Sequence, residues 1–175
     1  MGSSRMEDTL LDIAEAADQV FLAYAVAMSS AQGLEGDLVT LGLATGVCEL
    51  GGTSPCELED LDSHLSTKTM GQLLFFLKKN GYLDQTSHSE WFKAIKIRNQ
   101  LAHSFFVENV EKMLTVEGCE KLADELQEID QFLEHVQNEV RLTLPQVIAA
   151  LGLDAAEVNE TYVRECNKIL EGNRY

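Results

Sequence analysis

The spacing of apolar residues is the feature that most constrains the fold of this 175-residue chain. Apolar and aromatic side chains recur three and four positions apart, as on amphipathic helices, and no segment alternates as a half-buried strand does. Only two prolines, Pro55 and Pro145, interrupt the chain, so long helices are permitted almost everywhere. The pattern therefore predicts an all-α, single-domain helical bundle of about five to seven helices.

Glycines, prolines and capping residues divide this pattern into segments. Gly33 and Gly36 are expected to end the first helix, because glycine is unfavourable inside a helix, and Asp37 is a suitable N-cap for the next. Pro145 is expected to open a separate short helix. A loop is expected over 51–66. We expect helices over about 8–31, 37–50, 67–80, 87–106, 115–142, 145–152 and 154–171.

The length suits one domain. We expect residues 1–6 to be a disordered leader or a remnant of cloning, 7–142 to form the bundle, and 143–175 to be a helical extension packed on the same domain. The helix over 115–142 carries an apolar seam that is expected to pack on a neighbouring helix. The seam consists of Leu122, Leu126, Ile129, Leu133, Val136 and Val140.

The charge of the chain is strongly negative, with 13 basic residues against 29 acidic ones and a net charge of −16. Such a chain is not a general binder of nucleic acids or anionic membranes. The segment 67–103 differs, because it has a charge of +4 while the remainder has −20. Two interpretations stay open: a local basic surface that steers RNA, or ordinary solvent-exposed lysines. Acidic residues interrupt the apolar stretch 10–28, so we expect neither a signal peptide nor a membrane span.

The cysteines and histidines indicate no cofactor and no metal site. The four cysteines have neither a C-x-x-C pair nor zinc-finger spacing, which is typical of thiols in a reducing cytoplasm, and the acidic run over 57–62 lacks the ligand alternation of a calcium loop. His64 and His88 are expected at the surface. His135 has acidic neighbours and is expected on a solvated face, at most bordering a site. The cysteines are Cys48, Cys56, Cys119 and Cys166.

One basic residue lies where apolar residues are expected. On a helical wheel of 87–106, Arg98 falls near the middle of the apolar arc, between Ala94 and Ala102, while Asn99 and His103 share one edge. A buried arginine is costly unless it is paired. Three interpretations are open: an ion pair with an acid on another helix, a guanidinium that reaches out of a shallow groove, or the border of an anion-binding cleft or subunit interface.

The segment Arg98-Asn99-x-x-x-His103 resembles the hallmark of the HEPN superfamily (higher eukaryotes and prokaryotes nucleotide-binding). That hallmark is an arginine, usually followed by a polar residue, with a histidine four to six positions after the arginine. The helical setting over about 8–142 agrees with it, whereas the last two expected helices match no pattern. The resemblance implies a HEPN-like bundle that usually dimerises with two motifs face to face. Many members are metal-independent ribonucleases of toxin–antitoxin, phage-defence and RNA-guided immunity systems, and others are non-catalytic interaction or nucleotide-binding modules.

The residue chemistry fits the resemblance. RNA carries its own nucleophile, the 2′-OH; His103 would act as general acid or base, Arg98 would hold phosphate, and Asn99 would orient the site. Lys93 and Lys96 would contact the substrate. Arg98 and His103 project about 140° apart on a straight helix, so we expect a homodimer that pairs Arg98 of one protomer with His103 of the other.

We therefore expect a cytoplasmic endoribonuclease that cleaves RNA, with a protein antitoxin or regulator as a further partner. Two alternatives stay open. The first is a non-catalytic module that binds a regulatory protein or a nucleotide. The second is a helical bundle in which Arg98 only forms a structural ion pair.

Overall fold

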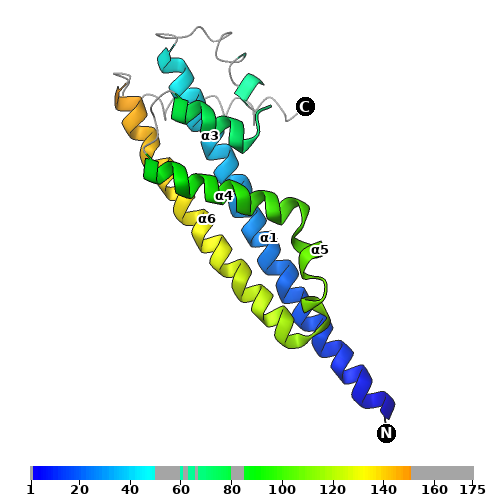
Figure 1. The fold of residues 1–175 in the computed structure, drawn as a ribbon. Helices are drawn as coiled ribbons and strands as arrows, with labels where there is room; N and C mark the ends of the chain where they lie inside the picture. The colour runs from blue at the N-terminus through cyan, green and yellow to red at the C-terminus, as the bar shows by residue number, and fades with distance from the viewer. Residues whose placement is uncertain (1, 50–59, 61–62, 66, 80–84, 151–175) are drawn as a thin grey trace, which may run out of the picture.

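The computed structural model describes residues 2–49, 60, 63–65, 67–79 and 85–150. It is a single helical bundle, and no strand occurs among these residues, which confirms the predicted all-α fold (Figure 1). In chain order, the elements are α1 (Gly2–Glu49), α3 (Met70–Lys79), α4 (Gln85–His103), α5 (Phe105–Asn109), the 3₁₀ turn η1 (Lys112–Leu114) and α6 (Val116–Ala150).

Two long helices, α1 and α6, lie side by side and run in the same direction, and α4 crosses both of them (Figure 1). Polar pairs bridge the long helices at matching heights. The Ser30 hydroxyl donates to Asp130 at 2.6 Å, and further along Gln137 donates to Asp37 at 2.8 Å. In both pairs the partners are 100 positions apart in the sequence. The two helices are therefore parallel, and their register is the same at both contacts.

The core lies between α1 and α6 and extends under α3 and α4. The predicted seam of α6 is confirmed, because five of its six residues are buried and Ile129 is partly buried against them. The apolar residues that recur at helical spacing in α3 are buried as well: Met70, Leu73, Leu74 and Leu77. Each fully buried aliphatic side chain contributes about 1.5–3 kcal/mol. The facing residues of α1 are Val20, Ala27, Ala31, Leu34, Leu38 and Leu41.

The expected break between two N-terminal helices is wrong, because α1 continues through Gly33 and Gly36. Gly33 allows a close contact with α6: a Cβ at this position would lie 2.6 Å from Nε2 of Gln137. Asp37, the expected N-cap, accepts hydrogen bonds from Gln137 at 2.8 Å and from Arg141 at 2.7 Å. Packing on α6 thus outweighs the low helix propensity of glycine. The helix also includes residues 2–6.

A second expected boundary is also wrong, because α6 passes through Pro145 and ends at Ala150. Proline inside a helix costs about 3 kcal/mol or more. On either side of it, however, Leu144 packs against the core and Val147 is buried. These contacts favour an unbroken helix over a separate one. The helix expected over 154–171 lies outside the described residues.

The helix expected over 87–106 is in fact two helices with a corner between them. Ser104 leaves helical geometry with φ −134° and ψ −14°, and α5 begins at the next residue. The corner buries Phe105 and places Phe106 4.6 Å from the ring of Tyr24. The Tyr24 hydroxyl donates to the carbonyl of Leu101 at 3.0 Å, one of the carbonyls that the end of a helix leaves without an intrahelical partner.

The loop expected over 51–66 is only partly described. Asp60 and residues 63–65 are helical, so the prediction is wrong there. Leu65 is buried at 1% exposure and anchors this turn in the core. The acidic run 57–62, apart from Asp60, lies outside the described residues, as does the expected stop at Asn80-Gly81.

Candidate functional site

Arg98 lies where α4 crosses α1, and it is paired. Its Nη2 is 3.1 Å from Oε2 of Glu35, and the two side chains are 28% and 30% exposed. Its Nη1 donates to Oδ1 of the neighbouring Asn99 at 3.4 Å. Of the three sequence interpretations, the ion pair to an acid on another helix is therefore present. The guanidinium also retains access to solvent, so that pairing and ligand contact are compatible.

The apolar arc of α4 is narrower than the helical wheel indicates. Trp91, Ala94 and Leu101 are buried, but Phe92 and Ala102 are exposed. Arg98 is therefore at the border of the buried face and not at its centre. The reason is that α4 lies across the long helices instead of along them (Figure 1). Fewer positions of α4 are therefore covered by neighbouring helices.

His103 and Asn99 are both exposed. His103 is the last residue of α4, directly before the corner at Ser104. The helix is continuous from Gln85 to His103, so Arg98 and His103 project about 140° apart. Arg98 turns toward α1, and within one protomer the structure does not bring it together with His103.

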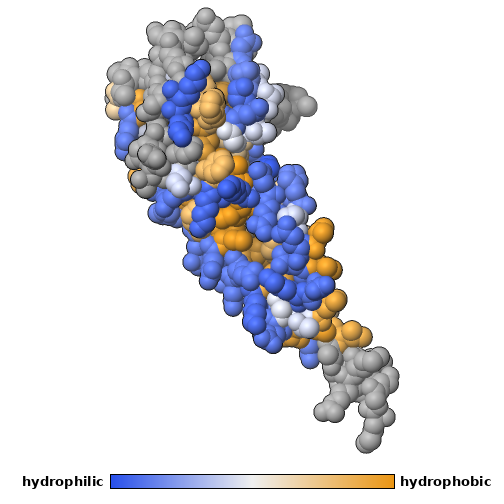
Figure 2. Space-filling view, in the orientation of Figure 1, coloured by the Kyte–Doolittle hydropathy of each residue, from blue (hydrophilic) through white to orange (hydrophobic). Residues whose placement is uncertain are grey.

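The two candidate substrate lysines lie on the exposed side of α4. The ammonium of Lys93 is 4.3 Å from the ring centroid of Phe132, and that of Lys96 is 4.9 Å from the ring of Phe92. Such cation–π contacts at exposed positions are weak, about 0.5–1 kcal/mol. Figure 2 shows hydrophilic surface interleaved with apolar surface in this region. Both lysines can thus leave their rings to contact an anion.

An apolar patch begins four residues after His103. It consists of the exposed residues Val107, Val110 and Leu114 of α5, its C-cap and η1, which are 80%, 56% and 66% exposed. We call it the α5 patch, and Figure 2 shows apolar surface along this edge of the molecule. Phe21 of α1, which is half exposed, contacts Phe106 behind it. Contiguous exposed apolar surface marks sites of protein contact.

A separate groove of about 200 Å³ lies between α1 and α6. It is lined by Leu22 and Val26 on α1 and by Gln127 and Asp130 on α6, among others. None of the motif residues on α4 contributes to it. The groove therefore offers no binding cavity for the candidate site.

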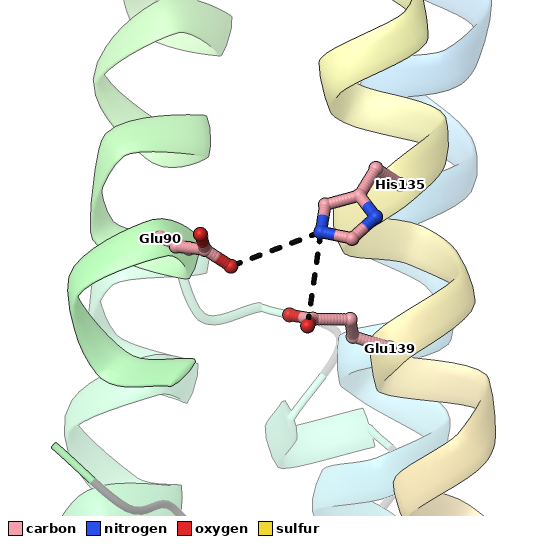
Figure 3. Close-up of side chains that lie close together, drawn as sticks. All are labelled: Glu90, His135 and Glu139. Carbon is pink, nitrogen blue, oxygen red and sulfur yellow. Dashed lines mark ion pairs between the residues drawn. The ribbon is translucent and has the colours of Figure 1, made fainter. Parts of the chain in front are cut away.

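Sequence reasoning missed a cluster at the other end of α4. Nε2 of His135 lies 3.9 Å from Oε2 of Glu90 and 3.7 Å from Oε1 of Glu139 (Figure 3). The i, i+4 spacing of His135 and Glu139 on α6 is visible in the sequence. Glu90 is on another helix, and no sequence pattern connects it to them.

Some of the other predicted residues have simple placements. His64 is exposed, as expected, and the side chain of His88 lies outside the described residues. Cys119 is buried and burial raises the pKa of its thiol, which disfavours the reactive thiolate. The side chains of the other three cysteines are outside the described residues.

Comparison of the chain with protein-family models, curated protein sequences and solved structures finds no match. Among the described residues, no helix combines the length and the apolar character that crossing a membrane requires.

Proposed function

We propose that this chain is a HEPN-type, metal-independent endoribonuclease whose site is completed by a second protomer. The observation that carries the proposal is the placement of the motif on α4. Arg98 is held at the edge of the bundle with 28% of its side chain exposed, and Asn99 and His103 are exposed on the same straight helix.

The ion pair of Arg98 prepares it for an anionic ligand. A guanidinium binds carboxylate and phosphate oxygens with the same planar fork of donors. Glu35 therefore restrains the arginine through a contact of 3.1 Å, and the exposed part of the guanidinium can contact a phosphate. Arg98 would stabilise the charge that develops on phosphorus, and Asn99 would orient the guanidinium through its carbonyl oxygen.

His103 would transfer the proton. It can accept the proton of the 2′-OH or protonate the leaving oxygen near neutral pH. The exposed position of its side chain leaves it accessible to RNA. Lys96 and Lys93, about two and three turns before His103 on α4, would contact neighbouring phosphates.

The separation of Arg98 and His103 on one helix favours a composite site in a homodimer. The α5 patch begins four residues after His103 and offers apolar surface for a second copy of the chain. A two-fold axis there would bring two α4 ends together. The setting we propose is an effector of a toxin–antitoxin or phage-defence system, held in check by a protein partner.

A complementation experiment tests the composite site. Arg98→Ala and His103→Ala are each expected to abolish RNA cleavage measured in EDTA. After the two variants are mixed and allowed to exchange subunits, heterodimers hold one intact pair of Arg98 and His103. Random exchange makes about half of the dimers heterodimers, and each heterodimer has one intact site of two. About a quarter of native activity should therefore return. A site formed within one protomer would give no recovery.

The controls separate folding from chemistry. His64→Ala removes an exposed histidine far along the chain from the motif and should leave cleavage unchanged. Circular dichroism and light scattering on each variant verify folding and dimerisation. A strictly monomeric protein that cleaves RNA would overturn the composite site, and a folded His103→Ala variant with native activity would overturn the catalytic role.

A second function is favoured by the same ion pair. Because Glu35 already neutralises Arg98 in a chain of net charge −16, the motif can serve as a structural element of a non-catalytic interaction or nucleotide-binding module. Absence of cleavage by the native dimer over a broad set of RNAs would support this function. Glu35→Gln separates the two functions. It releases Arg98 from the position proposed for phosphate binding and should lower nuclease activity, whereas in an interaction module it should only lower stability.

A further inference from the structure

The cluster of Glu90, His135 and Glu139 joins two helices at the opposite end of α4 from the motif. Glu90 lies on α4, and the other two residues lie one turn apart on α6 (Figure 3). One oxygen or nitrogen from each residue lies within 4.8 Å of the other two. The three side chains point toward one another across the helix contact.

The distances in the cluster are too long for direct hydrogen bonds. The imidazole Nε2 is 3.9 Å from Glu90 and 3.7 Å from Glu139, whereas N–H···O bonds measure about 2.7–3.2 Å. Two ligand atoms bound to one tetrahedral zinc ion lie about 3.3–3.6 Å apart, given metal–ligand distances of about 2.0–2.2 Å. Small rotations of these partly exposed side chains would close the remaining gap.

One carboxylate of the cluster, that of Glu139, is held by a hydrogen bond from a buried side chain. Trp91, which is 1% exposed, donates its indole Nε1–H to Oε2 of Glu139 at 3.3 Å. The other oxygen of that carboxylate, Oε1, faces His135. In metal sites, a carboxylate that binds the metal is commonly held by a hydrogen bond of this kind, which fixes one oxygen and leaves the other facing the metal.

Neighbouring basic groups are engaged elsewhere. Lys93, one turn after Glu90, lies over the ring of Phe132, and Arg141, two residues after Glu139, is bonded to Asp37 at 2.7 Å. Two carboxylates and one imidazole thus face a common point without a lysine or arginine between them. This donor set suits a divalent first-row transition metal more than calcium or magnesium, because imidazole is a preferred ligand of zinc and its neighbours.

We propose that Glu90, His135 and Glu139 bind one divalent transition-metal ion, with zinc as the reference metal and water in the remaining positions. The ion would clamp the N-terminal half of α4 onto α6. It would take no part in the RNA cleavage proposed above, which is tested in EDTA, so failure of either proposal is visible without the other.

Zinc binding by the folded chain is measured by isothermal titration calorimetry at neutral pH. The native protein should bind one equivalent with a melting temperature that rises with zinc concentration. His135→Ala and Glu90→Gln should each weaken binding at least about tenfold. Glu134→Gln, an exposed acid beside His135 but outside the cluster, is the matched control and should bind as the native chain does.

The support from Trp91 gives a second measurement. Trp91→Phe keeps most of the ring but removes the donor to Glu139, and it should weaken zinc binding about tenfold. The proposal is overturned if the native chain shows no saturable binding below about 1 mM. It is equally overturned if folded His135→Ala binds zinc with native affinity, because the metal is then held by other residues such as the cysteines.

Discussion

The two halves of α4 are held to the bundle in different ways. The N-terminal half packs on α6 through Trp91, a large side chain that is 1% exposed. The C-terminal half meets α1 through the ion pair of Arg98 with Glu35, whose side chains are 28% and 30% exposed, and through Leu101. Burial dominates at one end and charge contributes at the other.

The energies of the two contacts differ in size. Loss of a fully buried aromatic side chain costs about 3–5 kcal/mol, whereas a partly exposed ion pair contributes about 1 kcal/mol or less. The largest single anchor of α4, which we call the firm anchor, is therefore Trp91, beside Glu90 and Glu139. The motif half combines the partly exposed ion pair with the buried Leu101. A composite RNA site of the kind proposed above would benefit from such a distribution.

The largest expected effect concerns the firm anchor. Trp91→Ala should lower the free energy of unfolding by about 3–5 kcal/mol, because it leaves a cavity and removes the donor to Glu139. Denaturant unfolding followed by circular dichroism measures the change. Phe92→Ala, at the exposed neighbouring position, should cost about 1 kcal/mol or less. Equal losses for the two variants would contradict the contrast between burial and exposure on α4.

The ion pair should have the next largest effect. A fully buried pair would lose about 3–5 kcal/mol on removal of one partner, but the exposure of Arg98 and Glu35 reduces the expected loss for Arg98→Ala to about 1–2 kcal/mol. The double-mutant cycle with Glu35→Gln should give a coupling of about 1 kcal/mol or less. A coupling near zero would mean that the pair does not hold α4 to α1.

The cluster at the firm end should contribute little to stability without metal. His135 is exposed and makes no short hydrogen bond to either carboxylate, so His135→Ala should change the free energy of unfolding in EDTA by less than about 0.5 kcal/mol. With zinc present, the native chain should gain stability and the variant should not. A large loss in EDTA would instead identify the cluster as an ordinary ion pair.

The smallest expected effect lies at the corner after His103. Hydrogen bonds from the side chains of Ser104 and Gln100 hold the pKa of Glu108 below its usual value of 4.5. A lowered folded-state pKa means that this carboxylate stabilises the corner above about pH 4.5 and that the contribution is lost as the pH falls through the folded-state pKa.

Carbon-detected NMR titration of the Glu108 carboxyl measures this pKa. Gln100→Ala removes the donor that lies 2.9 Å from Glu108, and it should move the midpoint upward, toward 4.5. Glu117, whose pKa is lowered by its hydrogen bond with Lys121 instead, should keep its midpoint. An unchanged Glu108 midpoint would show that the corner is not tied by this bond.

Sequence periodicity was sufficient for the buried faces of α3 and α6 but not for the buried face of α4 or for the helix boundaries. The seam from Leu122 to Val140 follows from spacing alone, since apolar residues on one face of a helix must be covered. The continuity of α1 through Gly33 and of α6 through Pro145 did not follow. At both positions, contacts with a distant helix outweigh a local propensity.

For the candidate site, the sequence identified residue types and left their surroundings open. Arg98, Asn99 and His103 form a motif that local spacing reveals, and the angle between Arg98 and His103 follows from helix geometry. The sequence left three interpretations of Arg98 open, one of which was an ion pair with an acid on another helix. Only the crossing of α4 over α1 showed that this acid is Glu35.

The sequence by itself determined that this chain is all-helical, which faces of α3 and α6 are buried, and where an arginine and a histidine stand on one helix. Only the tertiary structure decided which side chains meet. Glu35 and Arg98 are 63 residues apart, and Glu90 and His135 come from different helices. The physical reason is that a helical repeat fixes directions within one helix, whereas contacts between helices depend on crossing angles set by the packing of all of them.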